Sequence, residues 1–219
     1  MTTTDTVAVV GTVWGDERHW DNLNGWLDCV RSLNRQPDQV VIATLPEQVD
    51  RLAGLPCEIA TCTTPRITHM TNAAVKLVRT DWVAPLAMDD RMYMHALDEV
   101  ATVPADVDVI SIGMVTTRGR VVPARPVENL WAGSGDMILG PSYIRTRVWR
   151  EVGGYDERFQ IEDWALWVAA ARAGARFATS AQITHILDID SPGRISSAGF
   201  PASAYREIDE LRLYGKIPL

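Results

Sequence analysis

Residues 153–177 read GGYDERFQIEDWALWVAAARAGARF, and this stretch decides how the fold is interpreted. Glu162 and Asp163 stand directly before a run that starts at Trp164 and is apolar on nearly every side, which is typical of a buried helix. Carboxylates in the first turn favour a helix N-terminus, and Gly174 is well placed to end the helix. Two acids held at the start of a rigid, core-packed helix indicate a functional site.

The composition indicates an ordinary globular α/β domain. The chain has 219 residues, which is long enough to bury a sizeable core in one domain. We expect a single domain over residues 1–219, with a core over about 7–190 and a C-terminal helix over about 202–214. The formal net charge of -7 argues against an extended surface that binds DNA or RNA, although it does not exclude a local basic groove.

Cysteine usage and hydropathy predict a soluble cytoplasmic protein. The three cysteines form no CxxC pair, and an odd count is a poor disulfide framework, so reduced thiols are expected. Residues 1–6 carry no basic segment, and no stretch reaches the roughly 18 apolar residues that a membrane span needs.

The start of the chain alternates between strand and helix patterns. Residues 7–10 and 39–43 are β-branched runs, and the apolar spacing that begins at Trp20 predicts an amphipathic helix between them. This β-α-β order predicts a parallel pair with a right-handed crossover, whose ligands bind beyond the carboxyl ends of the strands. The loops at 12–17 and 44–47 are therefore expected at a nucleotide site. No GxGxxG or GxxxxGK[ST] motif occurs, so dinucleotide and P-loop sites are disfavoured.

The remainder of the chain carries further predicted elements. A strand over 82–88 delivers Asp89 and Asp90, with an irregularity expected at Pro85 because a central strand tolerates proline badly. Helices are expected over about 73–79, 92–100 and 143–152, strands over 107–112, 137–139, 176–178 and 182–186, and a hairpin turn at 118–119. Ser142 is the expected N-cap of the third helix, whose solvated face is expected to carry Arg145, Arg147 and Arg150.

Three features together resemble one known family. The first feature is the stretch that reads GGYDE, EDW, an apolar helix and then AGARF. The second is the helix that contains Asn72, and the third is the run LAMDD at 86–90. All three occur in the order and approximate spacing of family 2 glycosyltransferases. These are nucleotide-sugar-dependent enzymes of GT-A fold, and the likeness extends from residue 7 to about 190. The resemblance implies a Rossmann-like, three-layer α/β domain with a mixed, mostly parallel central sheet.

The resemblance also implies roles for the acids. Asp163 corresponds to the general base that takes the proton of the acceptor hydroxyl, with Glu162 helping to position it or the acceptor. Asp89 corresponds to a ligand of Mn²⁺ or Mg²⁺, Asp90 stands beside it, and His185 is a candidate further metal ligand. A diphosphate leaving group develops negative charge, which such a cation bound by oxygen ligands stabilises. Ala87 occupies the place of the first aspartate in the family's metal-binding run.

Other positions are implied as substrate contacts. In the family an aspartate after the second strand contacts the donor base, and here Glu47 is the candidate substitute. The predicted donor contacts are Thr12, Trp14, Glu47, Asn72, Asp89 and Asp90. A loop over 123–136 is expected across the active-site face, so Trp131 is a predicted acceptor contact, with Asn129, Ser134 and Asp136 as further candidates. Trp164, directly after the acid pair, is the second predicted acceptor contact.

The predicted function is an inverting, metal-assisted, non-processive transfer of a hexosyl-type sugar to an acceptor hydroxyl. The acceptor is left open among a glycan, a protein, a lipid-linked sugar and a modified DNA base, and the oligomeric state is also open. One alternative is a catalytically impaired nucleotide-sugar or glycan-binding protein of the same fold, motivated by Ala87 and by residues 44–47. A sugar-phosphate nucleotidyltransferase would need basic residues in the loop at 11–17, which reads GTVWGDE.

Overall fold

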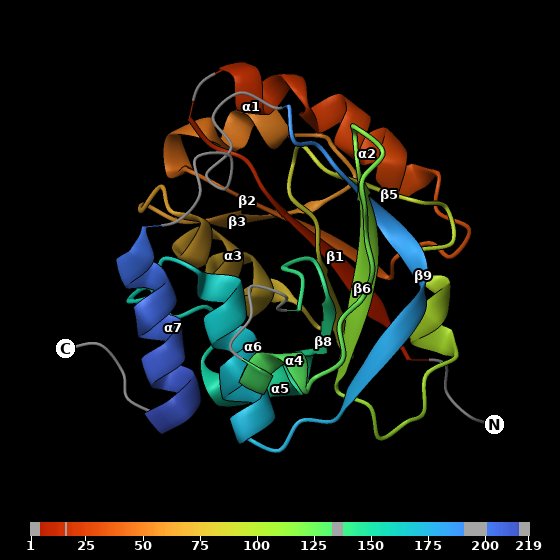
Figure 1. Cartoon of the computed structure of the whole chain (residues 1–219). Helices are drawn as coiled ribbons and strands as arrows, with labels where there is room; N and C mark the ends of the chain where they lie inside the picture. Colours follow the sequence, from red (N-terminus) through yellow and green to blue (C-terminus); the bar gives the residue numbers. More distant parts are fainter. Residues whose placement is uncertain (1–4, 16, 133–137, 191–200, 215–219) are drawn as a thin grey trace.

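The computed structural model describes residues 5–15, 17–132, 138–190 and 201–214, and in these ranges it contains one nine-stranded mixed sheet with helices on both faces (Figure 1). The strands are β1 (Val7–Thr12), β2 (Gln39–Thr44), β3 (Glu58–Thr61), β4 (Trp82–Pro85), β5 (Arg91–Met92), β6 (Val109–Thr116), β7 (Val121–Val122), β8 (Tyr143–Arg145) and β9 (Phe177–Leu187).

The longer strands of the sheet share one direction. The strand order is β3-β2-β1-β4-β8-β6-β9-β5, with β7 paired to β6. Strands β3, β2, β1 and β4 are parallel neighbours, and β6 is parallel to β9. Because β8 is antiparallel to both β4 and β6, those two strands point the same way. Among the strands of the described ranges, only the short β5, β7 and β8 run in the opposite direction, so the predicted mostly parallel sheet is confirmed.

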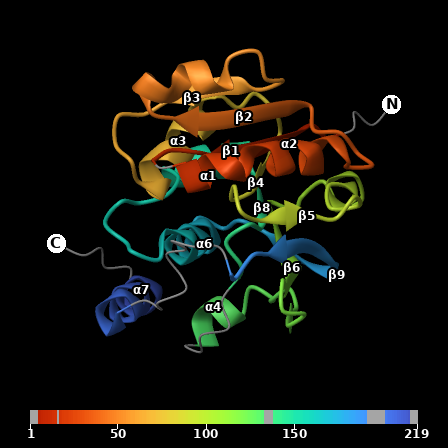
Figure 2. The ribbon, with the colours of Figure 1, turned by 90° about the horizontal axis from the view of Figure 1, so that it is seen from above.

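The helices form two layers around this sheet. They are α1 (Glu17–Asp21), α2 (Leu23–Arg31), α3 (Ile67–Leu77), α4 (Asn129–Ala132), α5 (Thr146–Val152), α6 (Glu162–Arg172) and α7 (Ala202–Tyr214), with 3-10 helices η1 (Pro46–Leu52) and η2 (Asp98–Ala101). Figures 1 and 2 show α1 and α2 over one face of β1 and β2, and α3 beneath the other. None of the helices in the described ranges is long and apolar enough to cross a bilayer.

Alternation along β1 explains the two layers. Val7 and Val9 are buried in the cluster that contains Trp26 of α2, whereas Ala8 and Val10 are buried in the cluster that contains the inner faces of α3, α5 and α6. Burial on both faces is typical of a parallel strand in an α/β protein. The tryptophans at 20, 26, 149 and 167 are all buried.

The topology brings distant segments to one edge of the sheet. From β1 the chain builds β2 and β3 on one side, then returns to place β4 on the other side of β1. This reversal is a topological switch point, and ligands of open α/β sheets bind beyond the carboxyl ends of the strands there. Helices α3 and α6 each precede a strand of the common direction, so their N-termini lie at the same carboxyl edge.

Several predicted elements differ in the structure. The helix expected over 92–100 is replaced by β5, a turn and η2, because Met92 pairs with His185 of β9. The helix expected after Ser142 starts only at Thr146, since residues 143–145 form β8 between β4 and β6. The two strands expected over 176–178 and 182–186 are one continuous strand, β9. Residues 138 and 139 form no strand, and Met137 lies outside the described residues.

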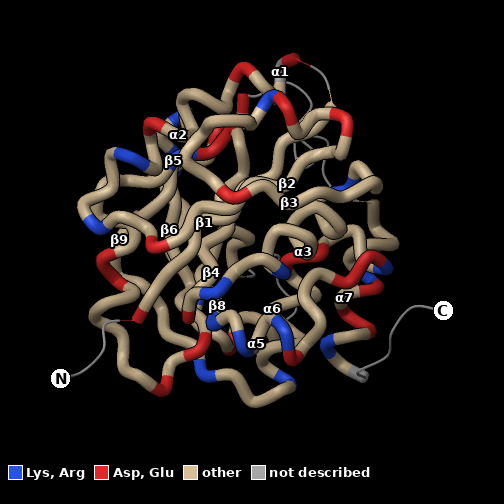
Figure 3. Tube along the Cα trace, turned by 180° about the vertical axis from the view of Figure 1, so that it is seen from behind, with Lys and Arg blue, Asp and Glu red and all other residues tan. Residues whose placement is uncertain are grey.

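The expected solvated arginine face is wrong for Arg145. Its guanidinium lies 4.3 Å from the ring centroid of Trp82 and 2.7 Å from Asp5, and the side chain is buried. Arg150 is exposed but donates to the carbonyl of Val78 at 2.6 Å, and exposed Arg147 pairs with Asp108. Figure 3 shows basic residues around β8, α5 and α6 with acidic residues among them. These arginines therefore join the elements of the fold.

Candidate active site

The two acids predicted from the sequence are the first two residues of α6. Glu162 and Asp163 begin the helix, and Oδ1 of Asp163 accepts the N–H of Trp164 at 2.8 Å. The helix ends at Arg172, and Gly174 follows with a φ of +88°, a left-handed conformation that favours glycine. Both carboxyl groups are partly buried, which places them at the border between the core and the carboxyl edge.

Burial changes the proton affinity of this pair. Desolvation raises the pKa of Asp163 above the usual range of an aspartate, although the N–H of Trp164 opposes the rise. Desolvation also raises the pKa of Glu162, and the neighbouring charge of Asp163 raises it further. Two such close carboxyls titrate as a pair, and Glu162 is the one that keeps its proton to higher pH. Carboxyls with raised pKa values in this kind of position are candidates for general acid or base chemistry.

Two neighbours of the pair were missed from the sequence. Gly140 lies so close that a Cβ built on it would be 2.7 Å from Oδ2 of Asp163. Tyr155 is buried, and its pKa is raised by burial and then by the charges of Asp163 and Glu162, so the phenol lies within electrostatic reach of both acids. The sequence signal for Tyr155 was its place in the GGYDE motif, whereas nothing local marked Gly140.

The predicted aspartates lie in the turn that follows β4. Asp89 is partly exposed, whereas Asp90 is buried and its Oδ1 accepts the N–H of Asp188 at 2.9 Å. Arg91 donates to the carbonyls of Met88 at 3.1 Å and Asp90 at 2.7 Å, which holds the turn. Asp188 directly follows β9, and its place after a predicted strand was the signal that could have found it.

The loops after β1 and β2 meet at the same edge. Thr12 is the buried last residue of β1, and Trp14 is partly buried in the loop that follows it. Glu47 is exposed in the first turn of η1, directly beyond β2. Gln48 of η1 donates to the carbonyl of Gly15 at 3.1 Å, which ties the two loops together. The structure thus brings Thr12, Trp14 and Glu47 to the switch-point edge with the aspartate turn.

Asn72 has a different environment from the other predicted donor contacts. Its Nδ2 donates to the carbonyl of Tyr155 at 2.8 Å, and its Oδ1 accepts the N–H of Tyr155 at 3.0 Å. The carboxamide is therefore engaged by the loop that leads to α6.

His185, the other predicted metal ligand, is buried in β9, and its role as a ligand stays a prediction. The side chain is 1% exposed, its Nδ1 lies 2.9 Å from Oγ1 of Thr184, and its ring centroid lies 5.9 Å from that of Tyr143. Burial lowers the pKa of His185 to about 3, so the imidazole is neutral at pH 7. In the described ranges no three His, Cys, Asp or Glu side chains are grouped to hold a metal ion. The partly exposed carboxylate of Asp89 fits Mg²⁺, which typically takes one or two carboxylates together with substrate phosphates.

The predicted acceptor residues are separated by the length of α6. Trp164 lies in the first turn, with its ring centroid 5.9 Å from that of Tyr205 on α7. The ring centroid of Trp131 instead lies 5.9 Å from the guanidinium of Arg172, which is the last residue of α6. At a rise of 1.5 Å per residue, the backbone of Arg172 is about 14 Å along the helix from that of Asp163. Asn129 is the first residue of α4 with Trp131, while Ser134 and Asp136 lie outside the described residues. Of the predicted acceptor residues that the structure describes, only Trp164 is therefore beside the acid pair.

Solved structures share this architecture at low sequence identity. TarS from S. aureus in complex with UDP-GlcNAc is similar with a TM-score of 0.73 and 16% identity, over 94% of this chain and 65% of that chain. The mannosyltransferase PcManGT from Pyrobaculum calidifontis, in complex with GDP-Man and Mn²⁺, is similar with a TM-score of 0.65 and 15% identity, over 88% of this chain and 59% of that chain. This chain thus spans less than two thirds of either.

The comparisons establish the fold. The likeness to these structures confirms the predicted GT-A-type, Rossmann-like α/β fold. No protein-family model matches the chain, and no curated protein sequence matches it. Membership of glycosyltransferase family 2 stays a prediction.

Proposed function

We propose that this chain is a nucleotide-sugar-dependent glycosyltransferase of the family 2 type, which moves a hexosyl group to an acceptor hydroxyl with inversion. The observation that carries the proposal is the pair Glu162 and Asp163, two partly buried carboxyls at the start of α6. They share the carboxyl edge of the sheet with the turn of Asp89. The sugar nucleotides bound by TarS and PcManGT support the choice of donor class.

The acid pair supplies the proton chemistry. Asp163 takes the proton of the acceptor hydroxyl while that oxygen forms a bond to the anomeric carbon, and the nucleoside diphosphate leaves with the electron pair of the broken bond. Glu162, whose pKa is raised further by the charge of Asp163, stays protonated and leaves Asp163 as the carboxylate. One base acting opposite the leaving group needs no covalent intermediate, so the displacement inverts the anomeric centre.

The donor side rests on Asp89 and on the joined loops after β1 and β2. Glu47 and Trp14 are placed to contact the nucleoside beyond the strand ends. When Mn²⁺ or Mg²⁺ is bound, Asp89 would hold it, and the cation would neutralise charge on the diphosphate. Asp90 supports the turn by accepting the N–H of Asp188.

The test replaces Asp163 by asparagine and compares it with a matched exposed acid. Wild type, Asp163→Asn and Glu151→Gln are incubated with UDP- and GDP-sugars and a panel of hydroxyl acceptors, and products are measured by mass spectrometry. Glu151 is an exposed residue on the adjacent helix α5. Asp163→Asn should bind donor normally and transfer on the order of 10²-fold more slowly or worse, while Glu151→Gln behaves as wild type. Full transfer by Asp163→Asn would remove Asp163 from the role of base.

Ala87 favours one competing function. It is exposed two residues after the end of β4, where the resembled family places an aspartate. A sugar-nucleotide-binding protein without turnover would bind donors in calorimetry and neither transfer nor hydrolyse any of them. Hydrolysis of a donor by wild type, lost in Asp163→Asn, would exclude that function.

A further inference from the structure

The carboxamide of Asn72 clamps a backbone segment 83 residues away in sequence. Its N–H group and its oxygen bind the carbonyl and the N–H of Tyr155 at 2.8 and 3.0 Å. This pair of hydrogen bonds reproduces the exchange that two residues make across an antiparallel sheet. It fixes both the position and the orientation of the Tyr155 peptide groups relative to α3.

A second tie joins the same two segments. His69 lies three residues before Asn72 on α3, which places both on one face of the helix. Nε2 of His69 lies 2.6 Å from Oε2 of Glu157, two residues beyond Tyr155. The loop between α5 and α6 is therefore bound to α3 at two successive points.

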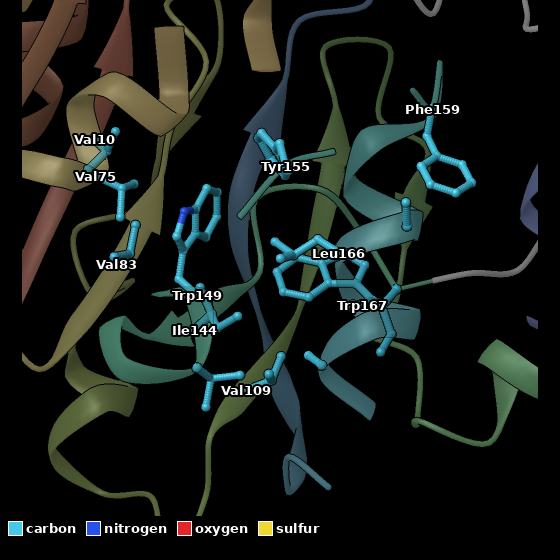
Figure 4. Packing of buried hydrophobic residues seen from close by; sticks show 14 of the residues in the cluster. Val10, Val75, Val83, Val109, Ile144, Trp149, Tyr155, Phe159, Leu166 and Trp167 are labelled. Atoms are coloured by element: carbon cyan, nitrogen blue, oxygen red, sulfur yellow. The ribbon is translucent and has the colours of Figure 1, made fainter. Parts of the chain in front are cut away.

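Close packing at Gly154 allows the clamp to form. A Cβ at this position would lie 2.4 Å from Oδ1 of Asn72 and 2.5 Å from Nε1 of Trp149. Gly154 also has a φ of +76°, which a side chain would strain. Figure 4 shows Trp149 and Tyr155 side by side, and their ring centroids are 4.8 Å apart. The motif GGYDE is thus shaped to receive Asn72.

The clamped loop leads into the acid pair. Phe159 and Ile161 are buried in the same cluster as α6, and Ile161 directly precedes Glu162. Helix α3 packs on β1, β2 and β3 and is followed by β4, which carries the turn of Asp89. The clamp therefore joins α3, which leads to the turn of Asp89, to the loop that leads to Glu162 and Asp163.

We propose that Asn72 is a positioning residue, which holds the acids of α6 at the carboxyl edge through the backbone of Tyr155 and does not contact the donor. The proposal rests on the proposed transferase for its catalytic consequence. It assigns Asn72 a role different from the donor contact that the sequence predicts.

Two substitutions of Asn72 separate the roles. Asn72→Ala removes both hydrogen bonds. Asn72→Asp keeps an oxygen that can accept the N–H of Tyr155 but loses the N–H group that donates to the carbonyl of Tyr155. Lys76→Ala, an exposed change one turn further along α3, is the matched control. Gly154→Ala disrupts the same two hydrogen bonds, because the new Cβ would collide with Oδ1 of Asn72.

The clamp predicts a split between turnover and donor binding. At saturating donor and acceptor, turnover should fall roughly 10- to 100-fold in Asn72→Ala and Gly154→Ala, because a displaced base acts from poor geometry. The Kd for the donor, measured by calorimetry, should stay within about twofold of wild type, since no donor contact is removed. A donor Kd weakened tenfold or more, with turnover kept at saturation, would make Asn72 a donor contact and overturn the proposal.

A readout without turnover keeps this proposal separate from the proposed function. The unfolding free energy is measured against pH for wild type, Asn72→Ala and Lys76→Ala, because alanine adds no ionisable group at position 72. Loss of the clamp should expose the acids and flatten the fall of stability with rising pH in Asn72→Ala, and the control should follow wild type. An unchanged pH dependence in Asn72→Ala would overturn the clamp. Absence of any transfer by wild type would instead overturn the transferase and leave this readout intact.

Discussion

Asp163 lies against a residue that has no side chain. The close approach of Gly140 to Oδ2 means that the carboxyl group has room in its present orientation only while position 140 is glycine. Gly140 does not have a positive φ, so the backbone there accepts other residues. Position 140 thus affects the acid without being a chemical participant.

Gly140→Ala should impair transfer more than stability. The new Cβ pushes on the end of a flexible side chain, so the chain folds, and a shifted base lowers turnover by roughly tenfold or more. Gly54→Ala is the contrasting control, since it has open space but a φ of +80°, and it should lose stability without loss of turnover. Equal turnover in Gly140→Ala and wild type would show that Asp163 need not hold this orientation.

At the scale of elements, the turn between β4 and β5 is held from two sides. Sγ of Cys29 on α2 accepts the N–H of Met92 at 3.1 Å, and Arg91 binds the carbonyls of Met88 and Asp90. These contacts fix the backbone on either side of Asp89 and leave its side chain partly exposed. The element therefore presents one carboxylate to the carboxyl edge.

Asp89→Asn should remove a metal effect on donor binding. Wild type should bind a UDP- or GDP-sugar about tenfold more tightly with Mn²⁺ than with a chelator, because Asp89 would hold the cation and the cation would neutralise charge on the diphosphate. In Asp89→Asn the two Kd values should converge, and Asp98→Asn, in the first turn of η2, should keep the wild-type difference. A full Mn²⁺ effect in Asp89→Asn would exclude Asp89 as the ligand.

At the scale of the whole molecule, the acid pair makes the fold sensitive to pH. A raised carboxyl pKa means that the folded chain binds protons that the unfolded chain has already released. The free energy of unfolding should therefore fall as the pH rises from the ordinary carboxyl pKa through the raised values. His185 acts in the opposite sense, since its lowered pKa costs stability as the pH falls below about 6.5.

Glu162→Gln should isolate the contribution of the acid pair. The amide cannot ionise, so between about pH 5 and pH 8 the variant should lose less unfolding free energy than wild type, by on the order of 1 kcal/mol. Urea denaturation at several pH values measures this, with Glu151→Gln as the control. Parallel curves for wild type and Glu162→Gln would show that Glu162 titrates as an ordinary glutamate.

Local pattern in the sequence determined the strands β1 and β2, the parallel start of the sheet, and α6 with its two acids and Gly174. Those features follow from short-range periodicity and from residue types at helix ends, which hold in any packed environment. Only the tertiary structure decided that residues 143–145 form β8, that Met92 pairs with β9, and that His185 is buried. Strands of two or three residues owe their conformation to partner strands distant in sequence, which local propensity does not record. The engagement of Asn72 by Tyr155, and of Asp163 by Gly140, has the same cause, since each pair meets only when the layers close.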